Sequence, residues 1–103
     1  MSIQEVIKDQ VTKNKVVLYM KGSADFPQCG FSANACNILR ACGVEDFHTV
    51  NVLEDPEIRS GIKEYANWPT IPQLYVNGEF VGGSDIMMEM YKSGELAKML
   101  QQG

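Results

Sequence analysis

Short apolar runs alternate with longer helical patterns along the first half of the chain, and this alternation constrains the fold more than any other feature. Val16–Met20 is rich in β-branched residues and is typical of a buried strand. An amphipathic helical pattern precedes it over about residues 2–13, and another follows Cys29-Gly30, with its expected stop at Gly43. Residues 47–52 predict the next strand. A strand–helix–strand unit of this kind requires parallel pairing and a right-handed crossover.

The second half predicts another helix, a hairpin and a final helix. Asp55-Pro56 places a capping residue before a proline, which favours a helix running to about Tyr65. Asn77-Gly78 is a strong hairpin signal between strands expected at 72–76 and 79–81. A last helix is expected to begin near Ser84-Asp85 and to turn four apolar residues inward: Ile86, Met90, Leu96 and Leu100. The order α-β-α-β-α-β-β-α predicts an α/β fold, a four-stranded mixed sheet flanked by helices on both faces.

Length and charge exclude several classes of function. A chain of 103 residues can bury one core, so we expect a single domain over residues 1–103. The formal net charge is −4 and the basic residues form no run, which argues against a nucleic-acid partner. No stretch approaches the roughly 20 apolar residues that span a bilayer, so we expect no membrane segment. Three cysteines are an odd number and favour a reducing compartment, for which we expect the cytoplasm.

Cys29 lies where a proline-containing loop meets a predicted helix. Free N–H groups and the positive dipole end of a helix stabilise a thiolate there and lower the pKa of the thiol. The motif is C-x-x-S, so the position one turn later is Ser32, which cannot form a disulfide. Exchange chemistry at Cys29 would therefore need an outside thiol to release its partner. We expect Ser32 to bond to the backbone.

The other candidate ligands are better explained as structural residues. Along one helix, Cys36 would lie about 10 Å from Cys29 and about 9 Å from Cys42, beyond the roughly 7 Å that a disulfide allows. Both are expected to pack against the core. The three cysteines and His48 lack the paired spacing of structural zinc sites, and His48 is expected to be an ordinary strand residue.

Taken together, four segments of the chain resemble the monothiol glutaredoxin family: Lys21-Gly22, Cys29-Gly30-Phe31-Ser32, Trp68-Pro69-Thr70-Ile71-Pro72 and Gly82-Gly83-Ser84-Asp85. Each segment alone is a weak signal, but the four occur in order and span essentially the whole chain. The length resembles the short bacterial and organellar members. The family often has cysteine where this chain has Ser84, a difference that leaves backbone contacts intact.

The resemblance implies a thioredoxin-like fold with a groove for glutathione. Pro72 matches the family's cis-proline, which would let the N–H and C=O of Ile71 pair with the extended glutathione backbone. Lys21 and Arg59 match the cations that contact the glycine carboxylate of glutathione.

The start of the last helix is implied to hold the other end of glutathione. The N–H groups of Ser84 and Asp85 can receive the γ-glutamyl carboxylate, and the Asp85 side chain can take the neighbouring ammonium. Trp68 is expected to pack rather than to bind. Cys42 is the better candidate of the two remaining cysteines for a secondary bridge to glutathione.

The family resemblance further implies a labile [2Fe–2S] cluster, which requires four ligands. One chain offers a single accessible thiol, Cys29, so the implied arrangement is a homodimer with two bound glutathiones. Such a dimer would pass its cluster to apo iron–sulfur acceptor proteins, and a BolA-like protein could replace one subunit.

Two alternatives stay open at this point. The chain could be a glutathione-dependent disulfide oxidoreductase that removes glutathione from mixed disulfides through Cys29 alone, with weak turnover implied by the resemblance. It could also be an interaction module without chemistry, although the presence of Lys21, Cys29, Pro72 and Asp85 argues against that.

Overall fold

The computed structural model describes residues 2–101, and its helices and strands follow the predicted order apart from the C-terminal end. None of the helices within this range is both long and apolar enough to cross a membrane. The elements are α1 (Ile3–Lys13), β1 (Val16–Met20), α2 (Gly30–Ala41), β2 (His48–Asn51), α3 (Pro56–Ala66), β3 (Gln73–Val76), β4 (Glu79–Gly82), α4 (Ser84–Ser93) and α5 (Glu95–Gln101).

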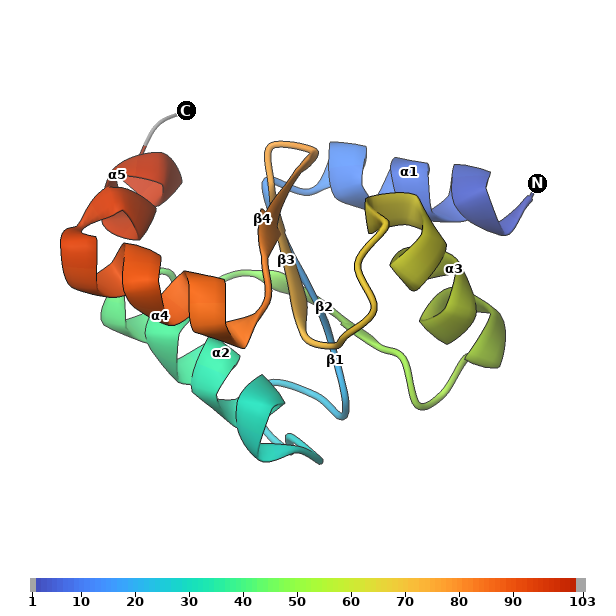
Figure 1. Ribbon diagram of the computed structural model, residues 1–103, viewed down its shortest axis with the longest axis horizontal. Coiled ribbons are helices and arrows are strands. Elements are labelled where there is room, and N and C mark those ends of the chain that lie inside the picture. Colours follow the sequence, from blue (N-terminus) through green and yellow to red (C-terminus); the bar gives the residue numbers. More distant parts are fainter. Residues whose placement is uncertain (1, 102–103) are drawn as a thin grey trace.

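The strands form one mixed sheet in the order β2-β1-β3-β4 (Figure 1). β1 pairs in parallel with β2 and antiparallel with β3, and β3 pairs antiparallel with β4. Asn77 (φ 52°) and Gly78 (φ 82°) close the β3–β4 hairpin with positive φ angles, as a type I′ turn requires. The predicted four-stranded mixed sheet is therefore confirmed.

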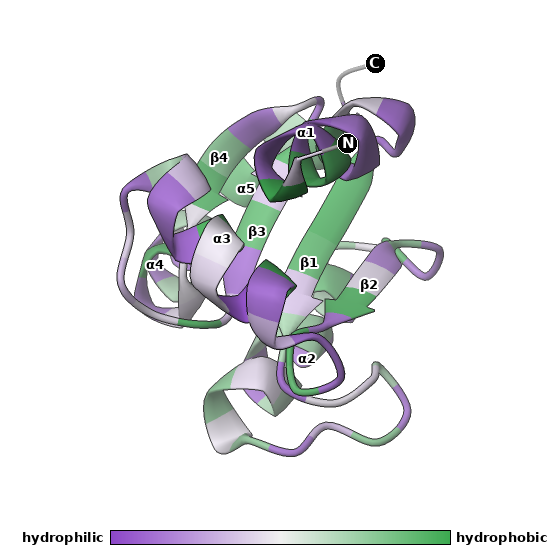
Figure 2. Cartoon of the chain, turned by 90° about the vertical axis from the view of Figure 1, so that its right-hand side faces the viewer, coloured by the Kyte–Doolittle hydropathy of each residue, from purple (hydrophilic) through white to green (hydrophobic). Residues whose placement is uncertain are grey.

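The helices cover both faces of the sheet, because successive side chains of a strand point to opposite sides. Val16, Leu18 and Met20 of β1 pack in one core cluster with apolar residues of α2, α4 and α5. Val17 and Tyr19 pack in a second cluster with residues of α1 and α3. Figure 1 shows these two helical layers on either side of the strands. In Figure 2, β1 is predominantly hydrophobic between them, whereas α1 and α3 carry hydrophilic residues.

The ends of α2 and α3 are set by residues in the left-handed region. After α2, Gly43 has φ +86°, and the N–H of Val44 donates to the C=O of Leu39. This is the Schellman pattern expected of a glycine stop. After α3, Asn67 has φ 51°, and the N–H of Trp68 donates to the C=O of Lys63. These bonds fix where the next loop leaves each helix.

The C-terminal end differs from the sequence prediction, which expected one helix. Gly94 adopts φ 84° and ends α4, and α5 starts again at Glu95. A glycine in the left-handed region cannot continue a right-handed helix, so the chain bends there. The buried face of α4 also differs from the prediction. Met87 is fully buried, while Ile86 is only partly buried.

Candidate functional site

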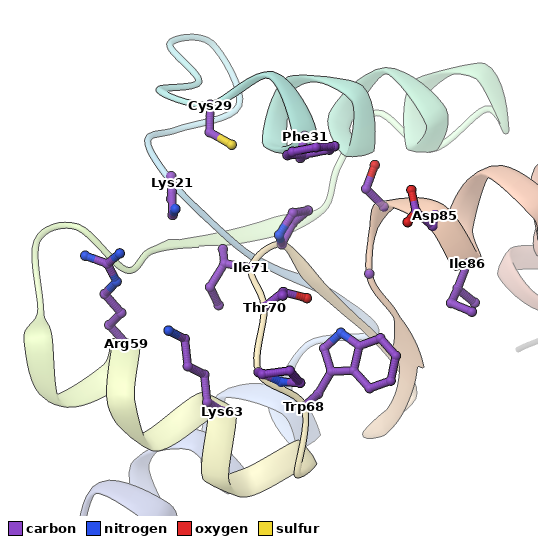
Figure 3. Close-up of a pocket in the computed structure, with 14 residues that line it drawn as sticks. Lys21, Cys29, Phe31, Arg59, Lys63, Trp68, Thr70, Ile71, Asp85 and Ile86 are labelled. Carbon is purple, nitrogen blue, oxygen red and sulfur yellow. The ribbon is translucent and has the colours of Figure 1, made fainter.

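Segments distant in the sequence converge at one edge of the sheet and enclose a cavity of about 390 Å³ (Figure 3). Its walls come from the end of β1, the start of α2, one face of α3, the loop before β3 and the junction between β4 and α4. All six residues predicted to form the site line this cavity: Lys21, Cys29, Arg59, Ile71, Ser84 and Asp85. The fold therefore brings the whole predicted set together.

Cys29 is the N-cap of α2 and is partly exposed to solvent. The backbone N–H of Ser32 is the main influence that lowers the pKa of the Cys29 thiol. Partial burial opposes it, while the N–H of Phe31, the charge of Lys21 and the Ser32 hydroxyl lower the pKa further. The predicted lowering by a helix N-terminus is thus confirmed.

Ser32 connects the start of α2 to the end of β1. Its side chain is fully buried, and its hydroxyl accepts a hydrogen bond from the N–H of Lys21 at 3.0 Å. The residue that replaces a second sulfur therefore bonds to the backbone, as predicted. It also fixes Lys21 relative to the turn of helix that holds Cys29.

The other two thiols lie in different surroundings. Burial raises the pKa values of Cys36 and Cys42. The Sγ atom of Cys36 lies 3.6 Å from the Sδ atom of Met20, and Cys42 packs against the same core cluster. Their predicted packing role is confirmed. His48 is an exposed residue of β2, and within residues 2–101 no group of three or more His, Cys, Asp or Glu residues could hold a metal ion.

The loop between α3 and β3 presents backbone groups to the cavity. The Ile71–Pro72 peptide bond is cis, as predicted. The Ile71 side chain is buried, and within the described range neither its N–H nor its C=O takes part in a hydrogen bond. A backbone group without a partner in the protein usually finds one in water or a ligand. Ile71 is therefore a ready partner for an extended peptide.

The junction between β4 and α4 forms another wall of the cavity, next to the Ile71–Pro72 loop. Gly83 is the N-cap of α4 and Ser84 is its first residue, so the first N–H groups of this helix have no intrahelical acceptor. A Cβ atom on Gly83 would lie 3.2 Å from the carbonyl oxygen of Pro72, which shows how closely the two segments approach. Asn34 of α2 donates from Nδ2 to Ser84 Oγ at 3.3 Å and holds this junction against α2.

Charges are divided between two sides of the cavity. Figure 3 shows the side chains of Lys21, Arg59 and Lys63 on one side and Asp85 on the other. None of these three cations forms an ion pair with a residue of the range 2–101. Lys63 was missed by the sequence analysis, yet the signal was present. It follows Arg59 by four residues on a predicted helix, and such residues share a face.

Two aromatic residues also line the cavity without having been predicted to do so. Trp68 packs on Phe80 with ring centroids 5.7 Å apart, as the expectation of packing requires, but it is also 36% exposed at the rim. Phe31 is 63% exposed beside Cys29. A signal for Phe31 was available in the sequence, because this aromatic residue lies inside the Cys29 motif but does not belong to the apolar face of α2.

Comparison with known proteins agrees with this geometry. The Glutaredoxin family model matches residues 16–81. The monothiol glutaredoxin ycf64-like of Synechocystis sp. is 62% identical over 95 residues, covering 92% of this chain and 88% of the relative. Glutaredoxin 4 of Escherichia coli is 52% identical over 98 residues, covering 95% of this chain and 84% of the relative.

The solved structures show the same fold. The solution structure of reduced poplar apo GrxS14 superposes with a TM-score of 0.84 at 50% identity, covering 96% of this chain and 90% of that one. The expected thioredoxin-like fold is therefore confirmed. With a family match over most of its length and a relative named a monothiol glutaredoxin at 62% identity, the chain belongs to the glutaredoxin family, in its monothiol branch.

Proposed function

We propose that the protein binds glutathione beside Cys29 and carries a labile [2Fe–2S] cluster, shared across a homodimer, for transfer to apo iron–sulfur proteins. One observation carries the proposal. A thiol with a lowered pKa lies in a cavity that has, on one side, cations without an ion-pair partner among residues 2–101 and, on the other, a carboxylate with a helix N-terminus.

The two sides of this cavity match the two ends of glutathione. The glycine carboxylate would lie against Lys21, Arg59 and Lys63, since charge-assisted contacts are the strong ones. The middle of the tripeptide would pair with the free N–H and C=O of Ile71 as a short added strand. The γ-glutamyl end would bind at α4, with its carboxylate on the first N–H groups and its ammonium on Asp85. This pose puts the glutathione sulfur near Cys29.

In this proposal the cluster is cargo that the protein delivers. A [2Fe–2S] cluster requires four ligands, usually thiolates, and this chain offers one suitable thiolate, because burial disfavours ionisation of Cys36 and Cys42. Two chains and two glutathiones supply four sulfurs. Because half of these ligands are exchangeable small molecules, the assembly suits release to an acceptor. A BolA-like protein is proposed as a partner that could replace one of the two subunits. The compartment proposed for this function is a reducing one, such as the cytoplasm.

Anaerobic reconstitution with iron, sulfide and glutathione tests the proposal. The wild-type chain should become a coloured dimer, and omission of glutathione or the change Cys29→Ser should leave a colourless protein. Cys42→Ser is the matched control and should retain the colour. A wild-type protein that stays colourless and monomeric under these conditions contradicts the proposal.

The lowered pKa of Cys29 also favours a second function, the removal of glutathione from mixed disulfides. The Cys29 thiolate would attack the glutathione sulfur, form a Cys29–glutathione disulfide and release the substrate thiolate. A second glutathione thiolate would then regenerate Cys29 and leave as oxidised glutathione, because Ser32 cannot resolve the disulfide. Turnover of a glutathionylated substrate, coupled to glutathione reductase, distinguishes the functions. Rates near background favour the carrier, and rapid turnover favours the enzyme.

A further inference from the structure

A glutamine amide lies fully buried behind the loop that presents Ile71. Gln73 is the first residue of β3 and has no exposed surface. Its Nε2 atom donates to the carbonyl oxygens of Trp68 at 3.1 Å and Thr70 at 3.2 Å. Its Oε1 atom accepts from the hydroxyl of Tyr75 at 3.2 Å. Burying an amide is unfavourable unless it is bonded, so these three contacts account for its place in the core.

The bond to Thr70 determines where the next N–H points. The cis peptide bond described for this chain joins Ile71 to Pro72, so the preceding Thr70–Ile71 peptide is trans. In a trans peptide the C=O and N–H groups point in opposite directions. Because the buried Gln73 binds the Thr70 carbonyl, the Ile71 N–H is directed away from Gln73, and Ile71 is one of the residues that line the cavity. This N–H has no acceptor within residues 2–101.

Tyr75 sets which end of the amide faces the loop. A glutamine side chain offers an oxygen that accepts and a nitrogen that donates, and a flipped amide would place its oxygen against two carbonyl oxygens. The Tyr75 hydroxyl donates to Oε1 and so leaves Nε2 for the loop. Burial raises the pKa of Tyr75, which keeps this hydroxyl protonated.

We propose that Gln73 is a positioning residue for glutathione: by binding the carbonyls of Trp68 and Thr70 from behind, it aims the Ile71 N–H at the backbone of the bound tripeptide. This inference rests on the proposed function, because it assigns a role within the same site. Gln73 itself is not among the residues that line the cavity.

The test compares reduced glutathione binding to the wild type, Gln73→Met and Leu100→Ala. Gln73→Met keeps the length of the side chain and removes its hydrogen bonds. Leu100→Ala also destabilises the fold, but it alters the core cluster on the other face of the sheet. By calorimetry, below the unfolding transition of each protein, Gln73→Met should weaken binding about tenfold, or about 1.4 kcal/mol. Leu100→Ala should stay within about twofold of the wild type, since its site is intact.

Two spectroscopic readouts separate positioning from a loss of stability. The backbone amide resonance of Ile71 should shift on addition of glutathione in the wild type and in Leu100→Ala, but much less in Gln73→Met. Trp68 is the single tryptophan of the chain, so its fluorescence reports on the same loop. The emission of Trp68 should move to longer wavelength in Gln73→Met but not in Leu100→Ala, because only Gln73→Met removes the hydrogen bond to the Trp68 carbonyl and so loosens the loop around the indole.

The outcomes distinguish this inference from the function on which it rests. A wild type that binds glutathione, with Gln73→Met binding equally well and Ile71 shifting as before, overturns the positioning role and leaves the proposed function intact. A wild type that fails to bind glutathione overturns both. Should Gln73→Met not fold, Tyr75→Phe keeps the aromatic ring and removes only the orienting hydroxyl. It should weaken binding about threefold, and unchanged affinity in that variant overturns the inference.

Discussion

Replacing Ser32 by alanine should weaken both the fold and the reactivity of Cys29, because one hydroxyl serves both. That hydroxyl is fully buried and accepts the N–H of Lys21 at 3.0 Å. In Ser32→Ala this N–H loses its acceptor, at a cost of about 1–3 kcal/mol. Alanine favours a helix slightly more than serine, which offsets a few tenths of a kcal/mol. We expect a net loss of about 0.5–2.5 kcal/mol.

The effect on the thiol has a definite direction. The Ser32 hydroxyl is one of the groups that lower the pKa of Cys29, so its removal raises that pKa. The backbone N–H of residue 32 is the main cause of the lowering and survives the substitution. The pKa should therefore rise while remaining below the ordinary value for cysteine. Alkylation of Cys29 at pH 7 should be slower than in the wild type.

Urea unfolding and the pH dependence of iodoacetamide alkylation measure the two effects. In a domain of about this size, 1 kcal/mol corresponds to a shift of roughly 4–8 °C in Tm, so thermal unfolding gives a second measure. Ser60→Ala is the matched control, because Ser60 is an exposed residue of α3. It should change stability by less than about 0.5 kcal/mol and leave alkylation unaltered. If Ser32→Ala behaves like this control in both assays, the reasoning that the Ser32 hydroxyl supports both the stability of the fold and the reactivity of Cys29 is wrong.

Three further predictions follow from single features of the structure. Lys21→Gln removes a charge that lowers the pKa of Cys29, so the alkylation profile should move to higher pH at low salt. Lys13→Gln changes an exposed side chain of α1 and should not move the profile, and an unchanged profile for Lys21→Gln would contradict the charge effect. Gly83→Val places a Cβ atom 3.2 Å from the carbonyl oxygen of Pro72 and should weaken glutathione binding at least about tenfold by calorimetry, whereas wild-type affinity would mean that the junction opens freely. Asn77→Ala puts a residue poorly suited to φ 52° into the hairpin turn and should cost about 1 kcal/mol in urea unfolding, and a stabilised variant would refute the turn assignment.

Two kinds of signal predicted the site: local chemistry pointed to Cys29 at the start of a helix, and the resemblance to the glutaredoxin family pointed to the remaining residues, Lys21, Arg59, Ile71, Ser84 and Asp85. Cys29 precedes a helix whose apolar periodicity is readable, and the effect of that helix on the thiol pKa is local. Ser84 and Asp85 follow a glycine pair that opens α4. Lys21 follows directly on β1. Lys63 was missed because a lysine on an amphipathic helix is normally exposed, and only the position of α3 relative to the cavity gives it another role.

The bend at Gly94 and the burial of Gln73 could not be predicted from the sequence. Helical patterns tolerate an isolated glycine, so nothing local showed that Gly94 would adopt a positive φ. Gln73 begins a strand next to apolar residues, where a polar side chain gives no indication of its partners. Its contacts with Trp68 and Thr70 depend on the path of the loop after α3, which Asn67 starts.

The sequence by itself determined the order of helices and strands as far as α4, the Asn77-Gly78 turn and the reactive position of Cys29, because each results from interactions within a few residues. Only the tertiary structure decided that the cations of α3, the backbone of Ile71 and the start of α4 surround that thiol. These segments meet because the strands pair in the order β2-β1-β3-β4, which places the end of β1, the start of β3 and the end of β4 at one edge of the sheet. The physical reason is that packing and strand pairing act between residues far apart in the chain, and a local sequence pattern does not indicate which distant residues will be in contact.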